Sequence, residues 1–352
     1  MTQPIKKPRS KSFHAPIVVE DVPLGTRQNL QLPVYENALG HPVLSPFVVV
    51  RGAQPGPVLG ICAATHGDEL NGINIIHRLL DSVDAEHLHG TLLCCPVVNV
   101  PAFEAGQRRF PEDDRDLNTC FPGRVNGTPS QQYARSFLER FLKSIDYLVD
   151  IHTASEGRLN SLYVRADWYS PAARDMARLL QPQIILHGRS GDKTLRSAAR
   201  ALGVPAVTLE AGNPSVFQGK MALEGEAGIR RVMAALGMIE NDHSPVSTRE
   251  PVLCDTSQWL RTIAGGILEQ TFELCEVVQK GQVLARLKNA FGEYTAEYKS
   301  PSDGIVIGMS RTPLAVPGTR YCHLGRIGLP APPKQPAGGR LLERLAPDDI
   351  SE

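Results

Sequence analysis

The sequence predicts an α/β protein, in which a mainly parallel mixed sheet is flanked by helices and followed by a small C-terminal β-barrel. Between residues 57 and 238, short runs that are apolar throughout alternate with segments of helical periodicity. This alternation is typical of parallel strands that are covered by helices on both faces. After residue 250 the helical periodicity ends, and strand-like runs follow one another between Gly- and Pro-containing turns.

The elements can be assigned in chain order. Residues 17–55 predict short strands that pair as a hairpin, because apolar and polar residues alternate there between turn signals. Residues 100–130 are too polar and too rich in Gly and Pro for an element of their own, and so long a loop is usually functional. In the alternating block, the predicted strands are 57–65, 91–100, 147–153, 184–188 and 205–212, and the predicted helices are 73–83, 130–145, 170–182, 195–203 and 225–238.

These patterns divide the chain into two domains and two tails. The α/β domain is predicted at 16–245 and the β-barrel at 250–330, joined by a polar linker. The tails, 1–15 and 331–352, are rich in Pro, Lys and polar residues, and we expect both to be disordered.

Composition excludes several classes of protein. The 352 residues carry 37 Lys and Arg against 37 Asp and Glu, so the basic field that non-specific nucleic-acid binding needs is absent. No apolar run approaches the roughly 20 residues that span a bilayer, and the N-terminus does not resemble a secretory signal. Seven scattered cysteines without CxxC spacing indicate buried thiols in a reducing compartment. We therefore expect a cytoplasmic protein with no nucleic-acid or membrane partner.

Polar side chains follow three of the predicted strands. His66 and Glu69 come after 57–65, His152 ends 147–153, and Glu210 lies near the end of 205–212. In open α/β sheets, ligands bind beyond the carboxyl ends of the strands. Two histidines and one carboxylate suit a catalytic zinc ion, which keeps a fourth position open for water. Each residue alone would equally suit a hydrogen-bonded polar group at a strand end.

Four segments in this order resemble the succinylglutamate desuccinylase/aspartoacylase family, a branch of the zinc carboxypeptidase superfamily. They are HGDELNGINIIHRLL, PVVNVPAFEAGQRRFPEDDRDLNTCFPG, DIHT and LEAG, and the resemblance covers most of the chain. It implies a zinc-exopeptidase-like fold and one zinc ion per chain, held by His66, Glu69 and His152. It also implies that Glu210 is the general base, although a strand-end carboxylate can instead cap a helix or form an ion pair.

The resemblance extends to residues of the long loop. Arg109 matches the family arginine that stabilises the developing oxyanion, while Arg108 would be a surface charge, and the reverse assignment stays open. Asp116 matches the aspartate that hydrogen-bonds the first zinc histidine, with an Asx turn as its alternative role. Asp150 lies two residues before His152 on the same strand face, and it would orient the site or pair with an arginine.

The chain departs from the family at Thr119. Family members carry Asn-Arg in this motif, where the arginine holds a substrate carboxylate, but here the sequence reads DLNT. A hydroxyl cannot replace a bidentate guanidinium, so Asn118 alone would keep its contact with the substrate. The missing charge would come from Arg158, Arg165 or Arg196, each of which would otherwise be a surface residue.

The C-terminal segment resembles a biotinyl/lipoyl-type β-barrel. Its hairpin KNAFGEY has no lysine at the tip, so the sequence favours a structural cap or assembly surface, including a homo-oligomer, over a carrier of a swinging arm. His187 and His323 lack partners at metal spacing and are not predicted ligands.

The sequence therefore predicts a zinc-dependent amidohydrolase that cleaves an N-acylated amino acid or similar small amide through a zinc-activated water. Zinc carboxypeptidase activity on short, including acidic, peptides is the nearest alternative, because the same chemistry cleaves both. A catalytically silent binding or assembly protein is the third interpretation, supported only by Thr119.

Overall fold

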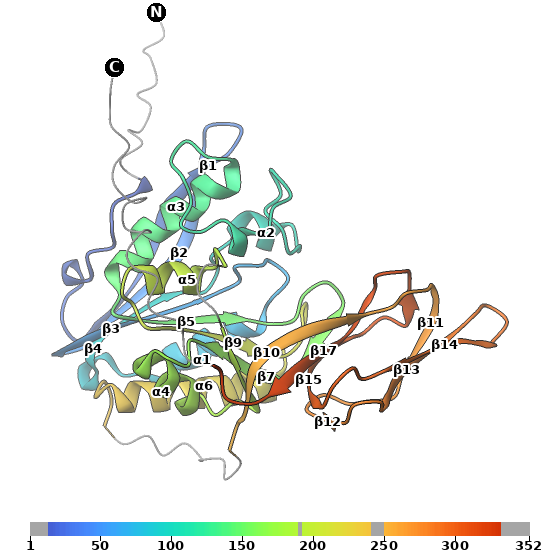
Figure 1. The fold of residues 1–352 in the computed structure, drawn as a ribbon. Helices are drawn as coiled ribbons and strands as arrows, with labels where there is room; N and C mark the ends of the chain where they lie inside the picture. The colour runs from blue at the N-terminus through green and yellow to red at the C-terminus, as the bar shows by residue number, and fades with distance from the viewer. Residues whose placement is uncertain (1–12, 189–191, 241–249, 332–352) are drawn as a thin grey trace, which may run out of the picture.

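A computed structural model describes residues 13–188, 192–240 and 250–331 of the chain. Helices and strands alternate in the first part, and strands alone make up the last part (Figure 1). Most of the two predicted tails and of the polar linker, namely 1–12, 241–249 and 332–352, lies outside the described residues. The α/β class is confirmed, and so is a C-terminal part made of strands.

The strands of the first part are β1 (Thr26–Glu36), β2 (Pro42–Arg51), β3 (Gln54–Ala63), β4 (His89–Cys95), β5 (Tyr147–His152), β6 (Arg158–Asn160), β7 (Leu162–Ala166), β8 (Ile184–His187) and β9 (Ala206–Ala211). Its α-helices are α1 (Asn71–Ser82), α2 (Val100–Glu104), α3 (Pro129–Phe141), α4 (Pro171–Leu179), α5 (Leu195–Ala201) and α6 (Gly219–Ala235). The last part contains β10 (Val252–Arg261), β11 (Gly266–Gln270), β12 (Val277–Val278), β13 (Val283–Lys288), β14 (Tyr294–Lys299), β15 (Gly304–Ser310), β16 (Leu314–Ala315) and β17 (Arg320–Ile327).

One mixed sheet runs through both parts. Its strand order is β1-β2-β4-β3-β5-β9-β7-β8-β10-β17-β15-β12, with β6 paired to β15. Strands β4, β3, β5 and β9 are parallel neighbours. Strand β1 is antiparallel to β2, β2 is antiparallel to β4, and β7 is antiparallel to β9 but parallel to β8. The centre of the sheet is therefore parallel, and its flanks are mixed.

Hydrophobic side chains pack on both faces of this sheet. Residues of α1, α4 and α6 form one core with the sheet, and residues of α3 and α5 form another on the opposite face (Figure 1). In β4, Leu92 and Cys94 enter the first core, while Leu93 and Cys95 enter the second. Successive side chains of a strand point to opposite faces, which explains why the central strands are apolar throughout. Six of the seven cysteines, all but Cys275, are buried thiols, as predicted.

Two local predictions were wrong. The segment 100–130 does contain elements, namely α2 and a 3-10 turn at Leu117–Thr119. Helix α2 begins where Asn99 accepts a hydrogen bond from the Ala102 N–H and Pro101 occupies the first turn, a strong capping signal. Strands β6 and β7 were missed, because their segment is short and carries Arg158 and Arg165 among its apolar residues.

The C-terminal strands form two sheets rather than one closed ladder. Strands β10, β17, β15 and β12 continue the main sheet, and β14-β13-β11-β16 form a second sheet that packs on it around a small core. Within residues 250–331, no strand pairing joins the two sheets into a barrel. Strand β10 pairs in parallel with β8 of the α/β part, so the C-terminal part is attached through the sheet itself.

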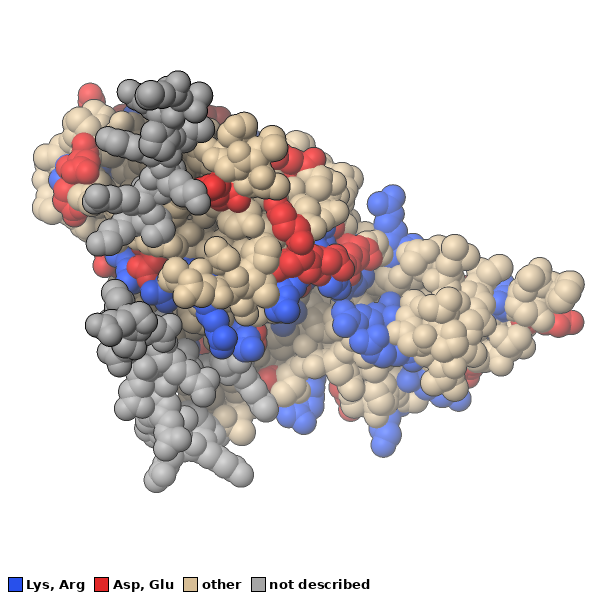
Figure 2. Space-filling model, turned by 90° about the horizontal axis from the view of Figure 1, so that it is seen from above, with Lys and Arg blue, Asp and Glu red and all other residues tan. Residues whose placement is uncertain are grey.

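The surface seen in Figure 2 carries interspersed basic and acidic side chains, in line with the equal numbers of the two charges. None of the helices in the described residues has the length and apolar character needed to cross a membrane.

Candidate active site

The ends of two strands, β3 and β5, bring the predicted metal ligands together. His66 and Glu69 lie in the turn between β3 and α1, in which the Glu69 N–H donates to the His66 carbonyl. Gly67 between them packs so closely on α2 that a Cβ atom there would meet the Ala102 backbone at 2.1 Å. Only glycine allows this approach, which holds the turn against its neighbour. His152 is the last residue of β5.

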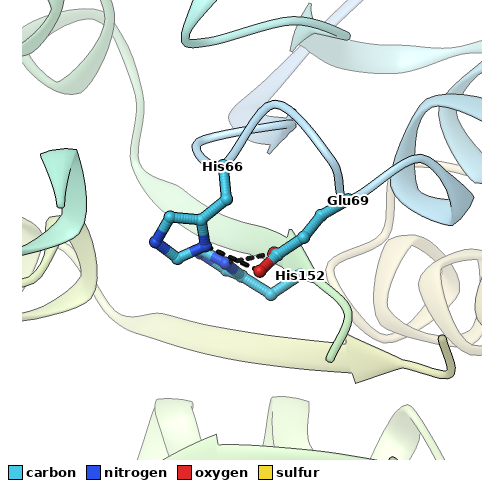
Figure 3. Close-up of side chains that lie close together, drawn as sticks. All are labelled: His66, Glu69 and His152. Carbon is cyan, nitrogen blue, oxygen red and sulfur yellow. Dashed lines mark hydrogen bonds and ion pairs between the residues drawn. The ribbon is translucent and has the colours of Figure 1, made fainter. Parts of the chain in front are cut away.

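The side chains of His66, Glu69 and His152 point toward one another (Figure 3). His66 Nδ1 lies 2.7 Å from Glu69 Oε1, and His152 Nδ1 lies 2.8 Å from Glu69 Oε2. Within the described residues, one ligand atom from each of the three lies within 4.8 Å of the others. All three are buried, so the cluster is shielded from bulk water.

Each imidazole lies between two carboxylates. Beyond the contacts to Glu69, His66 Nε2 is 2.9 Å from Asp116 Oδ1, and His152 Nε2 is 3.0 Å from Asp150 Oδ2. A neutral imidazole has a single N–H donor, so it can satisfy only one of its two carboxylates. The inner nitrogens and the Glu69 oxygens are then acceptors that need a proton or a cation between them. Outer carboxylates that fix the tautomer are characteristic of histidine ligands, so this donor set fits a metal ion.

The charges of this cluster shift its pKa values. Burial opposes ionisation of Glu69, but the two imidazoles hold the pKa of its carboxyl far below the usual range. Burial likewise opposes the charged form of His152, yet Asp150 and Glu69 raise its pKa well above the ordinary value. Asp116 also has a strongly lowered pKa despite burial, because His66 and Arg108 stabilise its charged form. The cluster therefore favours positive charge at its centre.

The cluster opens on a cavity of about 220 Å³ that also contains Glu210. Glu210 is the register partner of His152 on the neighbouring parallel strand β9, so the two side chains share a face of the sheet. Its Oε2 accepts a hydrogen bond from Asn160 Nδ2 at 3.1 Å, and its Oε1 lies 3.4 Å from Arg165 Nε. A carboxylate is thus held beside the cluster of His66, Glu69 and His152, called here the metal-type cluster, in a cavity sized for a small molecule.

The structure places Arg108, not Arg109, in the site. Arg108 donates to Asp116 at 2.6 Å, lies 3.3 Å from Glu69, and lines the cavity. The Arg109 side chain is 47% exposed, donates to the Asp114 carbonyl and does not line the cavity. The sequence-based choice between the two arginines is corrected accordingly. Adjacent residues of a loop point in different directions, and sequence spacing could not say which one faces inward.

The remaining predicted residues all lie near the cavity. Asn118 lines it and accepts a hydrogen bond from the Leu195 N–H at the start of α5. Thr119 donates to the Asp116 carbonyl and thus closes the 3-10 turn instead of facing the cavity. Arg158 and Arg196 both line the cavity, and Arg196 is buried with its Nη1 unpartnered among the described residues.

The sequence did not predict the side chains that the C-terminal strands contribute. Trp259 of β10 and His323 of β17 line the cavity and stack on each other with ring centroids 4.9 Å apart. Arg158 lies over the Trp259 ring at 5.9 Å. Although His323 is not a ligand, it is part of the cavity wall. No local signal marks such residues, because they reach the site only through the pairing of β10 with β8.

His323 supplies a prediction about stability. Burial, with Arg165, Arg158 and Arg320 nearby, holds the pKa of His323 well below its ordinary value. The unfolded chain therefore binds a proton below about pH 6.5 that the folded protein does not, so acidification lowers the free energy of unfolding. The penalty approaches about 1.4 kcal/mol per pH unit while His323 stays neutral in the folded state.

We expect the melting temperature of His323→Phe to fall less than that of the wild type when the pH is lowered from 7.5 to 5.5, as measured by scanning calorimetry. The variant also loses the contact of His323 Nε2 with Ser257 Oγ. This loss lowers the melting temperature of the variant at both pH values, so the change between the two pH values can still be compared with that of the wild type. Equal losses in the two proteins would mean that His323 is protonated when folded.

Comparison with known proteins gives one family match. The model of the succinylglutamate desuccinylase/aspartoacylase catalytic domain matches residues 55–236. A curated relative, the N-alpha-acetyl-L-2,4-diaminobutyric acid deacetylase of Halomonas elongata, is 28% identical over 302 residues, which cover 82% of this chain and 87% of the relative.

Solved structures share the fold over nearly the whole chain. A succinylglutamate desuccinylase from Silicibacter sp. TM1040 has a TM-score of 0.77 at 24% identity and covers 87% of this chain and 97% of its own. The product-bound structure of the ectoine utilization protein EutE from Ruegeria pomeroyi has a TM-score of 0.76 at 24% identity. The match covers 86% of this chain and 97% of the EutE chain. The similarity therefore includes C-terminal strands as well as the α/β part.

Proposed function

This chain belongs to the succinylglutamate desuccinylase/aspartoacylase family, and on that premise we propose that it is a zinc-dependent deacylase. It would hydrolyse the amide bond of an N-acylated amino acid or a similar small amide. The observation that carries this proposal is the buried His66, Glu69 and His152 cluster, which opens on the same cavity as Glu210. One metal-type cluster and one nearby carboxylate are the groups that metal-assisted hydrolysis requires.

His66 Nδ1, Glu69 and His152 Nδ1 are the groups that would hold the metal. The chemistry of this set supports zinc, because two imidazoles and one carboxylate are a common catalytic zinc set with a fourth position left open. When bound, zinc would supply Lewis acidity toward a carbonyl oxygen and toward water. Asp116 and Asp150 would keep each outer nitrogen protonated, which directs the inner lone pairs to the centre.

The other residues of the cavity would carry the proton transfer and the charge. Glu210 would accept a proton from the attacking water and return it to the departing amine, since one carboxylate can serve as base and then as acid. Arg108 would direct N–H donors toward the developing oxyanion, because its guanidinium is already fixed by Asp116 and Glu69. Both roles depend on groups that are in place before the substrate binds.

Substrate binding would rest on the arginines of the cavity wall. Arg158 and Arg196 come from segments other than the DLNT motif, and both line the cavity, where a guanidinium can pair with an anionic group. The curated relative is a deacetylase of an acetylated amino acid, which supports a substrate with an α-carboxylate. Asn118, beside His152 at 3.4 Å, would contact the reacting end of such a substrate.

Release of free amine from a panel of amides tests this function. The panel contains N-acetyl and N-succinyl amino acids, N-acetylated diamines and short acidic peptides, each with and without chelator treatment. We expect cleavage of at least one N-acyl amino acid, complete loss of activity on metal removal, and recovery when zinc is added back. Loss of the metal removes both the Lewis acid and the order of its ligands.

The alternatives give different results in the same assay. Cleavage restricted to the peptides would identify a carboxypeptidase. No cleavage at all, together with no bound zinc by elemental analysis, would identify a binding or assembly protein. Full activity in the chelated, metal-free protein would reject a metal-dependent mechanism.

A further inference from the structure

The carboxylate of Glu210 is held on both of its oxygens. Arg165 lies on Oε1 and also donates to the Tyr163 hydroxyl at 2.8 Å. Asn160 donates its side-chain N–H to Oε2 at 3.1 Å. A carboxylate has about four lone-pair sites, so these two contacts fix its orientation and still leave positions for a proton in transit.

Asn160 belongs to a strand that the C-terminal part holds in place. Strand β6 has only three residues, and its partner is β15, with Asn160 opposite Gly308. The next residue, Ser161, donates both its N–H and its hydroxyl to the Ile307 carbonyl of the same strand, at 3.1 and 2.9 Å. The position of Asn160 is therefore set by β15 rather than by a neighbouring strand of the α/β part.

The contact between Asn160 and Gly308 leaves no space for a side chain. A Cβ atom at Gly308 would lie 2.6 Å from Asn160 Oδ1 and 2.9 Å from the Leu159 carbonyl, and both separations are too short for these atoms. Asn160 is itself buried, so its amide has little room to move aside. Oδ1 thus rests against β15, and Nδ2 on the other side of the amide faces Glu210.

From this arrangement we propose that Asn160 is a positioning residue for Glu210, and that the C-terminal strand β15 sets its position through Gly308. The C-terminal part then acts on the reaction itself, in addition to contributing Trp259 and His323 to the cavity wall. The inference rests on the proposed role of Glu210. Without the Asn160 hydrogen bond, the carboxylate would rotate about its side-chain torsions and spend less time aligned for proton transfer.

Two substitutions of Asn160 and one matched control test the positioning role. We expect Asn160→Ala to lower kcat by about 10- to 100-fold, the range for removal of a supporting hydrogen bond, with KM changed less than about threefold and zinc content unchanged. Asn160→Asp places a second carboxylate against Glu210, so the acidic limb of its pH–rate profile should move to higher pH. Ser300→Ala, which loses a side-chain hydrogen bond within the C-terminal part but neither lines the cavity nor belongs to the segment that holds Asn160, should keep the wild-type kcat.

Gly308→Ala tests the part played by the C-terminal strand. Gly308 does not line the cavity, so this substitution can lower kcat only indirectly, by displacing residues that contact Glu210. We expect a fall of about tenfold, and we expect most of it to disappear when Gly308→Ala is combined with Asn160→Ala, because the displaced amide is then absent. Additive effects of the two substitutions would show that Gly308 acts independently of Asn160.

The outcomes separate this inference from the proposed function. A wild-type kcat in folded Asn160→Ala, or a rise in KM alone, would overturn the positioning role of Asn160. If Glu210→Gln is inactive in the same assay, the proposed function would still stand. An active Glu210→Gln would instead overturn the proposed function, and the inference with it. Circular dichroism and thermal melting of each variant identify any loss that is due to unfolding.

Discussion

Replacement of Glu210 by Gln is expected to abolish turnover while the protein stays folded and keeps its zinc. Glutamine preserves the shape of the side chain and one oxygen acceptor for Asn160, but it cannot take a proton from water or return it to an amine. The loss of general base catalysis should lower kcat by roughly 10²- to 10⁴-fold. Amine release under saturating substrate measures kcat, and elemental analysis measures the zinc content.

A carboxylate outside the cavity provides the control for this substitution. Glu226 of α6 forms an ion pair with Arg78 of α1 at 2.9 Å, so Glu226→Gln removes a carboxylate without touching the site. We expect wild-type kcat in this variant. Substantial activity in Glu210→Gln would remove Glu210 from the mechanism, and loss of zinc in that variant would mean that Glu210 contributes to the metal site.

Arg108→Ala and Arg109→Ala form a pair of neighbouring substitutions with opposite expected results. We expect Arg108→Ala to lower kcat by about 10²- to 10³-fold, because an N–H donor aimed at the oxyanion is lost. Arg109→Ala should stay within about threefold of the wild type, since exposed side chains away from the cavity contribute little. Steady-state kinetics of both variants on one substrate are sufficient for the comparison.

Zinc content must be measured in parallel, because Arg108 also contacts Glu69 and Asp116. Arg108→Lys keeps the charge but not the planar fork of donors, so an intermediate kcat is expected. A larger loss in Arg109→Ala than in Arg108→Ala would restore the assignment made from the sequence and reject the one made from geometry.

Prediction from sequence worked where the relevant signal is local. The β3 strand, the turn with His66 and Glu69, and the α1 helix follow one another within 30 residues, and their periodicities identify both elements to within three residues at each end. His152 and Glu210 could be singled out because polar residues at the carboxyl ends of buried parallel strands lie where ligands bind in open α/β sheets. Their convergence followed from the parallel order of the central strands, which the alternation of strands and helices already indicates.

The tertiary structure decided which side chains complete the site. Whether Arg108 or Arg109 faces the cavity depends on the path of a loop that packs on Asp116 and His66. Trp259 and His323 reach the cavity only because the sheet continues from β8 into β10, and Gly308 reaches Asn160 only because β6 pairs with β15. Contacts between residues more than 100 positions apart leave no periodicity in the sequence. The sequence therefore determined which residues form the cluster of His66, Glu69 and His152, because each stands at or just after the end of a recognisable strand. The walls of the cavity and the support of Glu210 were decided by packing alone.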